Sequence, residues 1–480
     1  MTHVSSSNFN HVGDVQTKKA TTQTNARRRS SIKILMLPTA AVDEGWSWVV
    51  CIACFFINFV LIGVWSSFGV LYVGLLEHYV DSNETDICSS ENRSQSSNAI
   101  SGQTAWIGSQ ATLFTFLLGP LSVSLATRWG VRPVVITGCC LFSIGLFLTA
   151  ATNQIWQAIL TYGVMGGLGG SMMYSPTVGS LPAYFRKRKS LAVCLARSGS
   201  WFGNLAFVSC MTVIRDEFGW RMQCVFLGCI GSLTIFMGAL YRPRPVQPAS
   251  ARPSVKEIVV QSCNSQRHRR FAVWVWIHSL HFFQLYLVLF HLVRHARCML
   301  GVDSTASSLL LVYLSAAAAC CSISNGILQD KVKNKILILQ FVIFVGGVAN
   351  LSFRFLTTYR HLIVYSILIG IGDSFLSAMC VIPQELVGSK EAVNAFGILS
   401  FSGGLVSCFG GPAGGWAFDA TGSYDVVFTI AGGFSVVSCL LMFCVSCSTK
   451  TKSEMVAEAS KNEPKSSPAA EVVGSVETSV

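Results

Sequence analysis

Charged residues are scarce in this chain of 480 residues. Asp, Glu, Lys and Arg make up 12% of it, against roughly 25% in soluble globular proteins, whereas 51% of its residues are hydrophobic. So few charges cannot cover a surface that faces water. The composition therefore excludes a soluble enzyme, a disordered scaffold and a secreted disulfide framework, and it predicts a polytopic membrane protein.

Motifs that would indicate site chemistry are also missing. No Cys-x-x-Cys pair stands in a polar loop, and nearly all of the 18 cysteines lie in apolar runs, so neither a metal site nor a redox motif is indicated. Without a Gly-x-x-x-x-Gly-Lys loop we expect no ATP hydrolysis. No nucleophile stands beside a base in the polar loops, which argues against an enzyme, and we expect no cofactor.

Basic residues outnumber acidic ones by 35 to 23, giving a net charge of +12. They gather in short clusters between apolar runs, as basic residues do in the cytoplasmic loops of membrane proteins. This distribution argues against binding to nucleic acid and predicts that both termini are cytoplasmic. Residues 1–40 are polar and Arg-rich and the first apolar run is long, so we expect no cleavable signal peptide.

Apolar segments close to the ~20 residues that cross a bilayer recur along the chain. Only helices or closed barrels satisfy backbone hydrogen bonds in lipid, and runs of this length are helices. The sequence therefore predicts an all-α integral membrane protein with 12 transmembrane helices. We place them at 46–75, 104–127, 133–151, 156–181, 191–213, 221–241, 271–292, 306–328, 336–356, 362–386, 392–417 and 426–447.

A basic loop at 242–270 divides these segments into two sets of six. We therefore predict an N-terminal six-helix half at 43–241 and a C-terminal half at 271–447, with disordered cytoplasmic tails at 1–42 and 448–480. This layout is typical of a two-halved transporter whose substrate site lies between the halves.

Two polar stretches carry short motifs for modification or binding. Asn83 and Asn92 begin Asn-x-Ser/Thr sequons in a loop that we place outside the cell, where they are candidates for glycosylation. The chain ends in Thr478-Ser479-Val480, which is typical of a PDZ-domain ligand. The alternative for the second motif is a tail that merely ends with these residues.

The mouths of the first and fifth apolar segments carry two further motifs. Residues 43–48 read Asp-Glu-Gly-Trp-Ser-Trp, and residues 184–203 begin Tyr-Phe-Arg-Lys-Arg-Lys. Both resemble signatures of the monocarboxylate transporter family (solute carrier family 16-like) of the major facilitator superfamily. The matching positions are Asp43, Gly45, Trp46, Trp48, Tyr184, Phe185, Arg188, Gly199 and Gly203.

The resemblance covers about residues 43–447. It implies the major facilitator fold and transport of a small organic substrate across the plasma membrane. It also implies, for some members, an accessory single-span glycoprotein partner. The tryptophans have a physical interpretation as well, because such rings anchor a helix at a membrane interface.

The chain departs from the lactate carriers of this family at their charged positions. They have a lysine midway along the first span, where this chain has Ser66, and an Asp and an Arg in the eighth span, where it has Ala318 and Ser322. Because those charges bind a carboxylate and couple it to a proton in the lactate carriers, their loss favours facilitated diffusion. Proton-linked transport stays open.

Two charges remain inside the predicted spans, and an intramembrane charge is costly, so each is a functional candidate. Arg197 lies in the fifth span and Asp373 in the tenth, and we consider a pair between them. Arg197 is a candidate for binding a substrate carboxylate or for gating. The alternatives are that Arg197 reaches the headgroups and that Asp373 caps a local kink.

His278 and His281, three residues apart in the seventh span, are candidates for carrying a proton at physiological pH, together with Asp373. The alternative is that these histidines are hydrogen-bonded packing residues.

Two functional hypotheses follow from these observations. The first is a secondary carrier with alternating access that moves a small monocarboxylate or related metabolite, with or without a proton. The second is a signalling or scaffold protein that keeps the carrier fold, binds a ligand and reports through its C-terminal motif.

Overall fold

A computed structural model describes residues 45–79, 95–241, 266–332, 334–378, 381–387 and 392–462. These residues form helices and connecting turns, without a strand among them, which confirms the all-α prediction. Asp43, Asn83, Asn92, Thr478 and Val480 lie outside the described residues.

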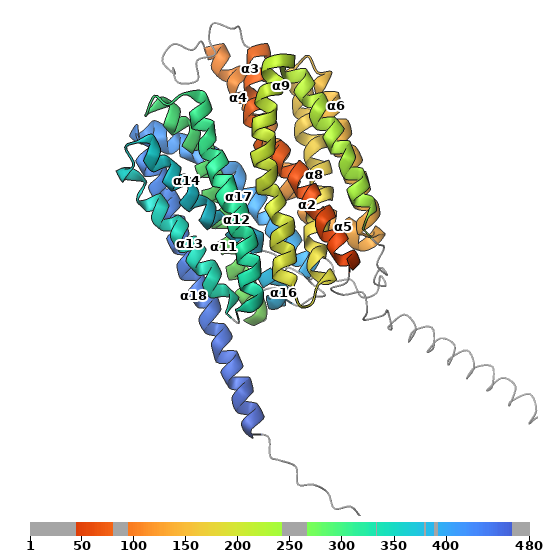
Figure 1. Ribbon diagram of the computed structural model, residues 1–480, viewed down its shortest axis with the longest axis vertical. Helices are drawn as coiled ribbons and strands as arrows, with labels where there is room; N and C mark the ends of the chain where they lie inside the picture. The colour runs from red at the N-terminus through yellow and green to blue at the C-terminus, as the bar shows by residue number, and fades with distance from the viewer. Residues whose placement is uncertain are drawn as a thin grey trace, which may run out of the picture.

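The first part of the chain folds into helices with short irregular joints (Figure 1). In chain order they are α2 (Gly45–Ser66), α3 (Phe68–Tyr79), α4 (Gln95–Leu117), α5 (Gly119–Trp129), α6 (Val131–Ala150), α7 (Ile155–Ala158), the π-helical η2 (Ile159–Gly166), α8 (Gly167–Ser180), η3 (Leu181–Tyr184) and α9 (Lys189–Ala239).

The second part is built in the same way. Its helices are α11 (Gln266–Cys298), α12 (Ser304–Lys331), α13 (Lys335–Leu351), η5 (Phe353–Phe355), α14 (Tyr359–Asp373), α15 (Phe375–Ala378), α16 (Val381–Val387), α17 (Ala392–Thr421) and α18 (Tyr424–Asn462).

Each of the predicted apolar segments coincides with helical structure. Within the described residues, 8 helices are long and apolar enough to cross a membrane, and the pair α4–α5, bent by 47°, is a further candidate. α9 counts once among them, although its 51 residues cover both the fifth and the sixth predicted segments. These helices indicate a multi-pass membrane protein. The exact number of crossings stays a prediction.

Three of the spans are broken where we expected continuous helices. The first is interrupted at Ser67, whose hydroxyl donates to the carbonyl of Val64 at 3.0 Å. The second bends at Leu118, directly before Pro120 at the start of α5, because proline lacks the amide that would continue the helix. The tenth predicted span is interrupted after Asp373, the last residue of α14, where the amide of Ser374 donates to the carbonyl of Gly370.

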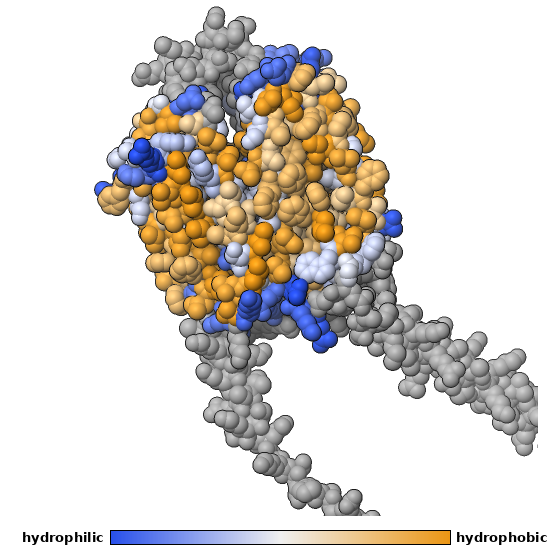
Figure 2. Space-filling model, in the orientation of Figure 1, coloured by the Kyte–Doolittle hydropathy of each residue, from blue (hydrophilic) through white to orange (hydrophobic). Residues whose placement is uncertain are grey.

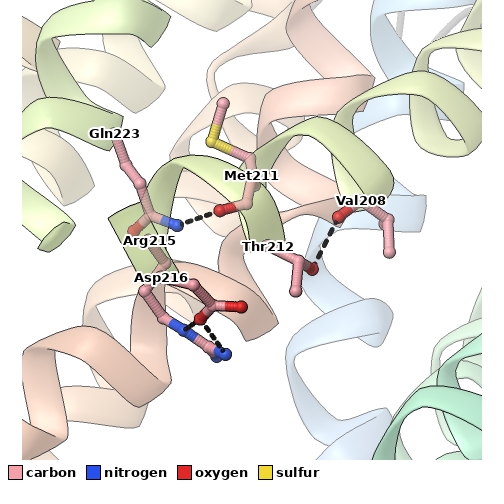
Figure 3. Close-up of polar contacts among 6 residues, drawn as sticks. All are labelled: Val208, Met211, Thr212, Arg215, Asp216 and Gln223. Atoms are coloured by element: carbon pink, nitrogen blue, oxygen red, sulfur yellow. Dashed lines mark hydrogen bonds and ion pairs between the residues drawn. The ribbon is translucent and has the colours of Figure 1, made fainter. Parts of the chain in front are cut away.

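α9 is a helical hairpin rather than one rod. Its two limbs meet at Gly219, whose φ of 78° and ψ of 173° lie outside the helical region and suit a residue without a Cβ atom. Gln223 of the second limb donates from Nε2 to the carbonyl of Met211 in the first limb at 2.6 Å (Figure 3). Arg215 and Asp216, next to the turn, form an exposed ion pair.

Figure 1 shows α2 to α9 and α11 to α18 as two groups of helices lying side by side. We call the end of the molecule where α2 begins and from which α18 continues the terminal end. Figure 2 shows an apolar side surface with polar patches near both ends. Large apolar side chains that are exposed include Phe56, Phe236, Trp276 and Phe341, as a helical bundle in lipid requires.

Candidate functional site

The Arg197 side chain lies between the two groups of helices. It is only 6% exposed, which gives no support to the interpretation that it reaches the headgroups. Its Nη1 donates to the hydroxyl of Tyr174 in α8, and its Cζ lies 5.2 Å from the centroid of that ring. Its Nε has no hydrogen-bond partner among the described residues.

Tyr174 connects this arginine to a chain of aromatic rings that crosses from one group of helices to the other. Phe116 of α4 contacts both Tyr174, with ring centroids 5.2 Å apart, and Phe282 of α11, at 5.4 Å. Tyr174 in turn lies 5.7 Å from Phe396 of α17. The arginine therefore sits where four helices from both groups meet.

Asp373 is paired with His281 rather than with Arg197. The Nε2 atom of His281 lies 3.3 Å from Oδ1 of Asp373, and both side chains are almost fully buried. No ion pair joins Arg197 to any acidic side chain of the described residues in this conformation. The kink after Asp373 is closed by Ser374, whose hydroxyl donates to the carbonyl of Ile371 at 2.6 Å. The capping role that we considered for Asp373 therefore falls to its neighbour.

The two histidines of α11 face different neighbours although they are only three residues apart. His281 pairs with α14, whereas the ring of His278 lies 4.5 Å from that of Phe282 and against Gly403 of α17. The structure thus brings His281 and Asp373 together and places His278 nearer the boundary with the first group of helices.

Ser66 and Ser322, which stand where the lactate carriers have charges, lie apart. Ser66 is the last residue of α2, beside the break in the first span, and is half-buried. Ser322 is fully buried, donates to the carbonyl of Ala318 at 2.6 Å and contacts the hydroxyl of Ser377 at 2.6 Å. In this conformation both interactions of Ser322 are internal to the second group of helices.

The two signature motifs pack against each other. Trp48 meets Phe185 edge to face with ring centroids 5.1 Å apart. Gly203 lies so close to the carbonyl of Phe59 that a Cβ atom would collide with it. A Cβ atom at Gly199 would likewise collide with the carbonyl of Phe55, one turn earlier in α2. These glycines let α2 and α9 approach without intervening side chains.

The remaining signature positions lie around this contact. Tyr184 is buried and Arg188 directly precedes α9. Trp46 is half-exposed at the start of α2, and a Cβ atom at Gly45 would meet open space.

Asp330, near the C-terminus of α12, is a residue that the sequence analysis missed. Its carboxylate oxygens accept hydrogen bonds from the backbone amides of Ser190 and Leu191, each at 3.0 Å. These amides belong to the first turn of α9, whose partial positive charge stabilises an anion. Asp330 therefore ties the two groups of helices together at the terminal end.

Replacing Asp330 with alanine is expected to loosen this tie, because two charge-assisted hydrogen bonds, each worth about 1.5–3 kcal/mol, are lost. We predict that trypsin cleaves the purified protein several-fold faster at the neighbouring basic loop, Arg186–Lys189, and that substrate uptake falls. Asp216→Ala removes an exposed acid and serves as the control. Equal cleavage rates in Asp330→Ala and the wild type would contradict the assignment.

Comparisons with known proteins agree with this architecture. The model of the Major Facilitator Superfamily matches residues 47–296 and 294–476. Relatives include monocarboxylate transporter 13 of Rattus norvegicus, 25% identical over 88% of this chain and 95% of its own length. Monocarboxylate transporter 11 of Mus musculus is 27% identical over 83% and 87%, respectively.

Two solved structures share the fold. The human organic anion transporter MFSD10 (TETRAN) superposes with a TM-score of 0.63 at 14% identity, covering 83% of this chain and 100% of its own. A variant of the E. coli fucose:proton symporter FucP gives a TM-score of 0.64 at 12% identity, covering 84% and 99%. The family match spans both groups of helices, and the relatives are transporters rather than enzymes. The chain therefore belongs to the Major Facilitator Superfamily, as a membrane transporter related to the monocarboxylate transporters.

Proposed function

We propose that this protein is a secondary carrier of small monocarboxylates or related organic anions in the plasma membrane, with both termini cytoplasmic. The observation that carries the proposal is Arg197, a buried cation without an acidic partner among the described residues. A charge inside the membrane is costly unless it is compensated. A substrate carboxylate would supply the missing negative charge.

Alternating access is supported by the contacts between the two groups of helices. Asp330 joins α12 to the start of α9 at the terminal end, and Arg197 lies about two turns further along α9. A substrate at Arg197 would reach the terminal side only when this tie opens. Binding between two halves and gating by their relative movement is the usual mechanism of such folds.

The energy source is either the substrate gradient alone or the substrate gradient with a proton. The pair of His281 and Asp373, buried in the second group of helices, is the place where a proton would be held. A PDZ-domain partner and an accessory single-span glycoprotein stay predictions. The signalling alternative gains no support from relatives that are named as transporters.

Expression in cells of low background tests the proposal. Labelled lactate, pyruvate and larger monocarboxylates are supplied in turn while uptake and internal pH are recorded. We expect saturable uptake of at least one acid, and acidification beyond that of control cells if a proton accompanies it. No uptake above vector-transfected cells for any acid, with the protein at the surface, would refute the proposal.

A further inference from the structure

Ser190 lies in the first turn of α9, where the two groups of helices meet at the terminal end. Its side chain is fully buried, and its Oγ atom has no hydrogen-bond partner among the described residues. Buried polar atoms are nearly always hydrogen-bonded. An unpaired hydroxyl of this kind points to a partner or a reaction that the present conformation does not hold.

α12 of the second group of helices covers Ser190. Asp330 accepts a hydrogen bond from the Ser190 amide at 3.0 Å. A Cβ atom at Gly326, one turn earlier in α12, would lie only 3.2 Å from the Ser190 carbonyl oxygen. Both contacts break when the terminal end opens, so the hydroxyl becomes accessible from that side in the open conformation.

A run of four basic residues directly precedes Ser190. Arg186, Lys187 and Arg188 are exposed, and Lys189 is half-buried. Kinases recognise their substrates by such charge patterns. Lys187 and Arg188 stand three and two positions before the serine, where many Ser/Thr kinases select basic side chains.

The first turn of α9 takes its anion from the other group of helices. Arg188, the residue before α9, makes no side-chain capping hydrogen bond within the described structure, whereas Asp330 accepts from two amides of that turn. A phosphate on Ser190 would bring a charge of about −1.5 to −2 and three acceptor oxygens to the same place. It would compensate the helix terminus from within α9 and repel the Asp330 carboxylate.

We propose that Ser190 is a phosphorylation site and that its modification releases the tie between α12 and α9. A protein kinase transfers the γ-phosphoryl group of ATP to Oγ. The new O–P bond replaces the bond to ADP, which leaves, and the hydroxyl proton passes to the base of the kinase. The modified carrier stays open at the terminal end, so its uptake falls. The inference rests on the proposed function in one respect, the cytoplasmic position of the terminal end, where kinases and ATP are present.

Phosphorylation of the purified full chain tests the site without requiring transport or orientation. The protein in detergent is incubated with ATP and the catalytic subunit of cAMP-dependent protein kinase, and the peptide that contains Ser190 is analysed by mass spectrometry. We expect phosphate on Ser190 in the wild type, and several-fold faster modification in Asp330→Ala, whose terminal end opens more easily. No phosphate on Ser190 in either protein would overturn the proposal, whatever the uptake assay shows.

Cys194, one turn further along α9, reports the opening. It is fully buried, and its Cβ atom lies 2.8 Å from the position of a Cβ atom at Gly326 of α12. We expect a maleimide to modify Cys194 several-fold faster in the phosphorylated protein and in Ser190→Asp than in the wild type, and at the wild-type rate in Ser190→Ala. Cys139, buried between α6 and the second limb of α9, is the internal control and is expected to react at one rate throughout.

A double variant shows whether the effect acts through Asp330. Asp330→Asn removes the charge that a phosphate would repel, so Ser190→Asp is expected to add little to the Cys194 labelling rate in that background. An equally large effect of Ser190→Asp with and without Asp330→Asn would overturn the proposed release. Phosphorylated wild type that labels at the unmodified rate would overturn it as well.

Discussion

Replacing Arg197 with glutamine is expected to reduce carboxylate uptake at least about tenfold at equal surface expression. The substitution keeps a polar side chain of similar length but removes the charge-assisted hydrogen bonds to the substrate, which are worth about 1.5–3 kcal/mol. Because the arginine has no acidic partner among the described residues, its loss leaves no uncompensated carboxylate behind in the protein. Initial rates at low substrate concentration, normalised to surface-biotinylated protein, measure the effect.

The control for this variant is Arg215→Gln, in the same helix. Arg215 forms an exposed ion pair with Asp216 near the turn of the hairpin, so its loss is expected to leave uptake within about twofold, as surface ion pairs contribute little. Unchanged uptake by Arg197→Gln would remove the charge role from this residue.

The pair of His281 and Asp373 is expected to show strong coupling in a double-mutant cycle. Removing one member of a buried polar pair costs about 1–3 kcal/mol, and more for a charged group, because the other member is left without a partner, whereas replacing both by apolar residues is often neutral. His281→Leu is therefore predicted to lower the thermal stability of the purified protein sharply, and His281→Leu with Asp373→Val to restore much of it. Uptake is predicted to stay low in the double variant if the pair holds the transported proton.

Lys335 and Glu385 offer a matched exposed pair, with side chains 22% and 52% exposed. Lys335→Ala is expected to change the thermal stability little. A double variant of His281 and Asp373 that is less stable than either single variant would show that the two residues do not act as a pair.

The helical fold is predictable from the sequence because lipid imposes a simple rule. A segment that crosses it must be apolar and helical, so composition alone locates the segments. The turn at Gly219 falls in the polar stretch between the fifth and sixth predicted segments. The breaks at Ser67 and Leu118, in contrast, interrupt runs that are uniformly apolar or nearly so. Their positions depend on single residues and on packing, and hydropathy averages over both.

Arg197 and Asp373 are also predictable as candidates, since a charge in a span is rare. Their partners are not. Asp373 pairs with a histidine 92 positions earlier, and nothing in the local sequence distinguishes His281 from His278. Only the packing of α11 against α14 separates them.

Tyr174, Asn204 and Asp330 are residues of ordinary types that the sequence analysis passed over. Asp330 follows an apolar run and is typical of a solvated loop end, yet the fold places it against the first turn of α9. Asn204 donates a hydrogen bond to Ser315, which lies 111 residues away in the sequence. Such juxtapositions between the two groups of helices are set by tertiary structure alone.

Counterflow in proteoliposomes tests the central claim most directly. Purified protein is reconstituted, the vesicles are loaded with an unlabelled monocarboxylate that gives saturable uptake in cells, and a trace of the labelled acid is added outside without ATP or an ion gradient. A carrier with alternating access predicts transient accumulation of label above equilibrium, lost in Arg197→Gln. Label that enters no faster than in protein-free vesicles, with this acid and with the other monocarboxylates supplied in turn, would contradict the account.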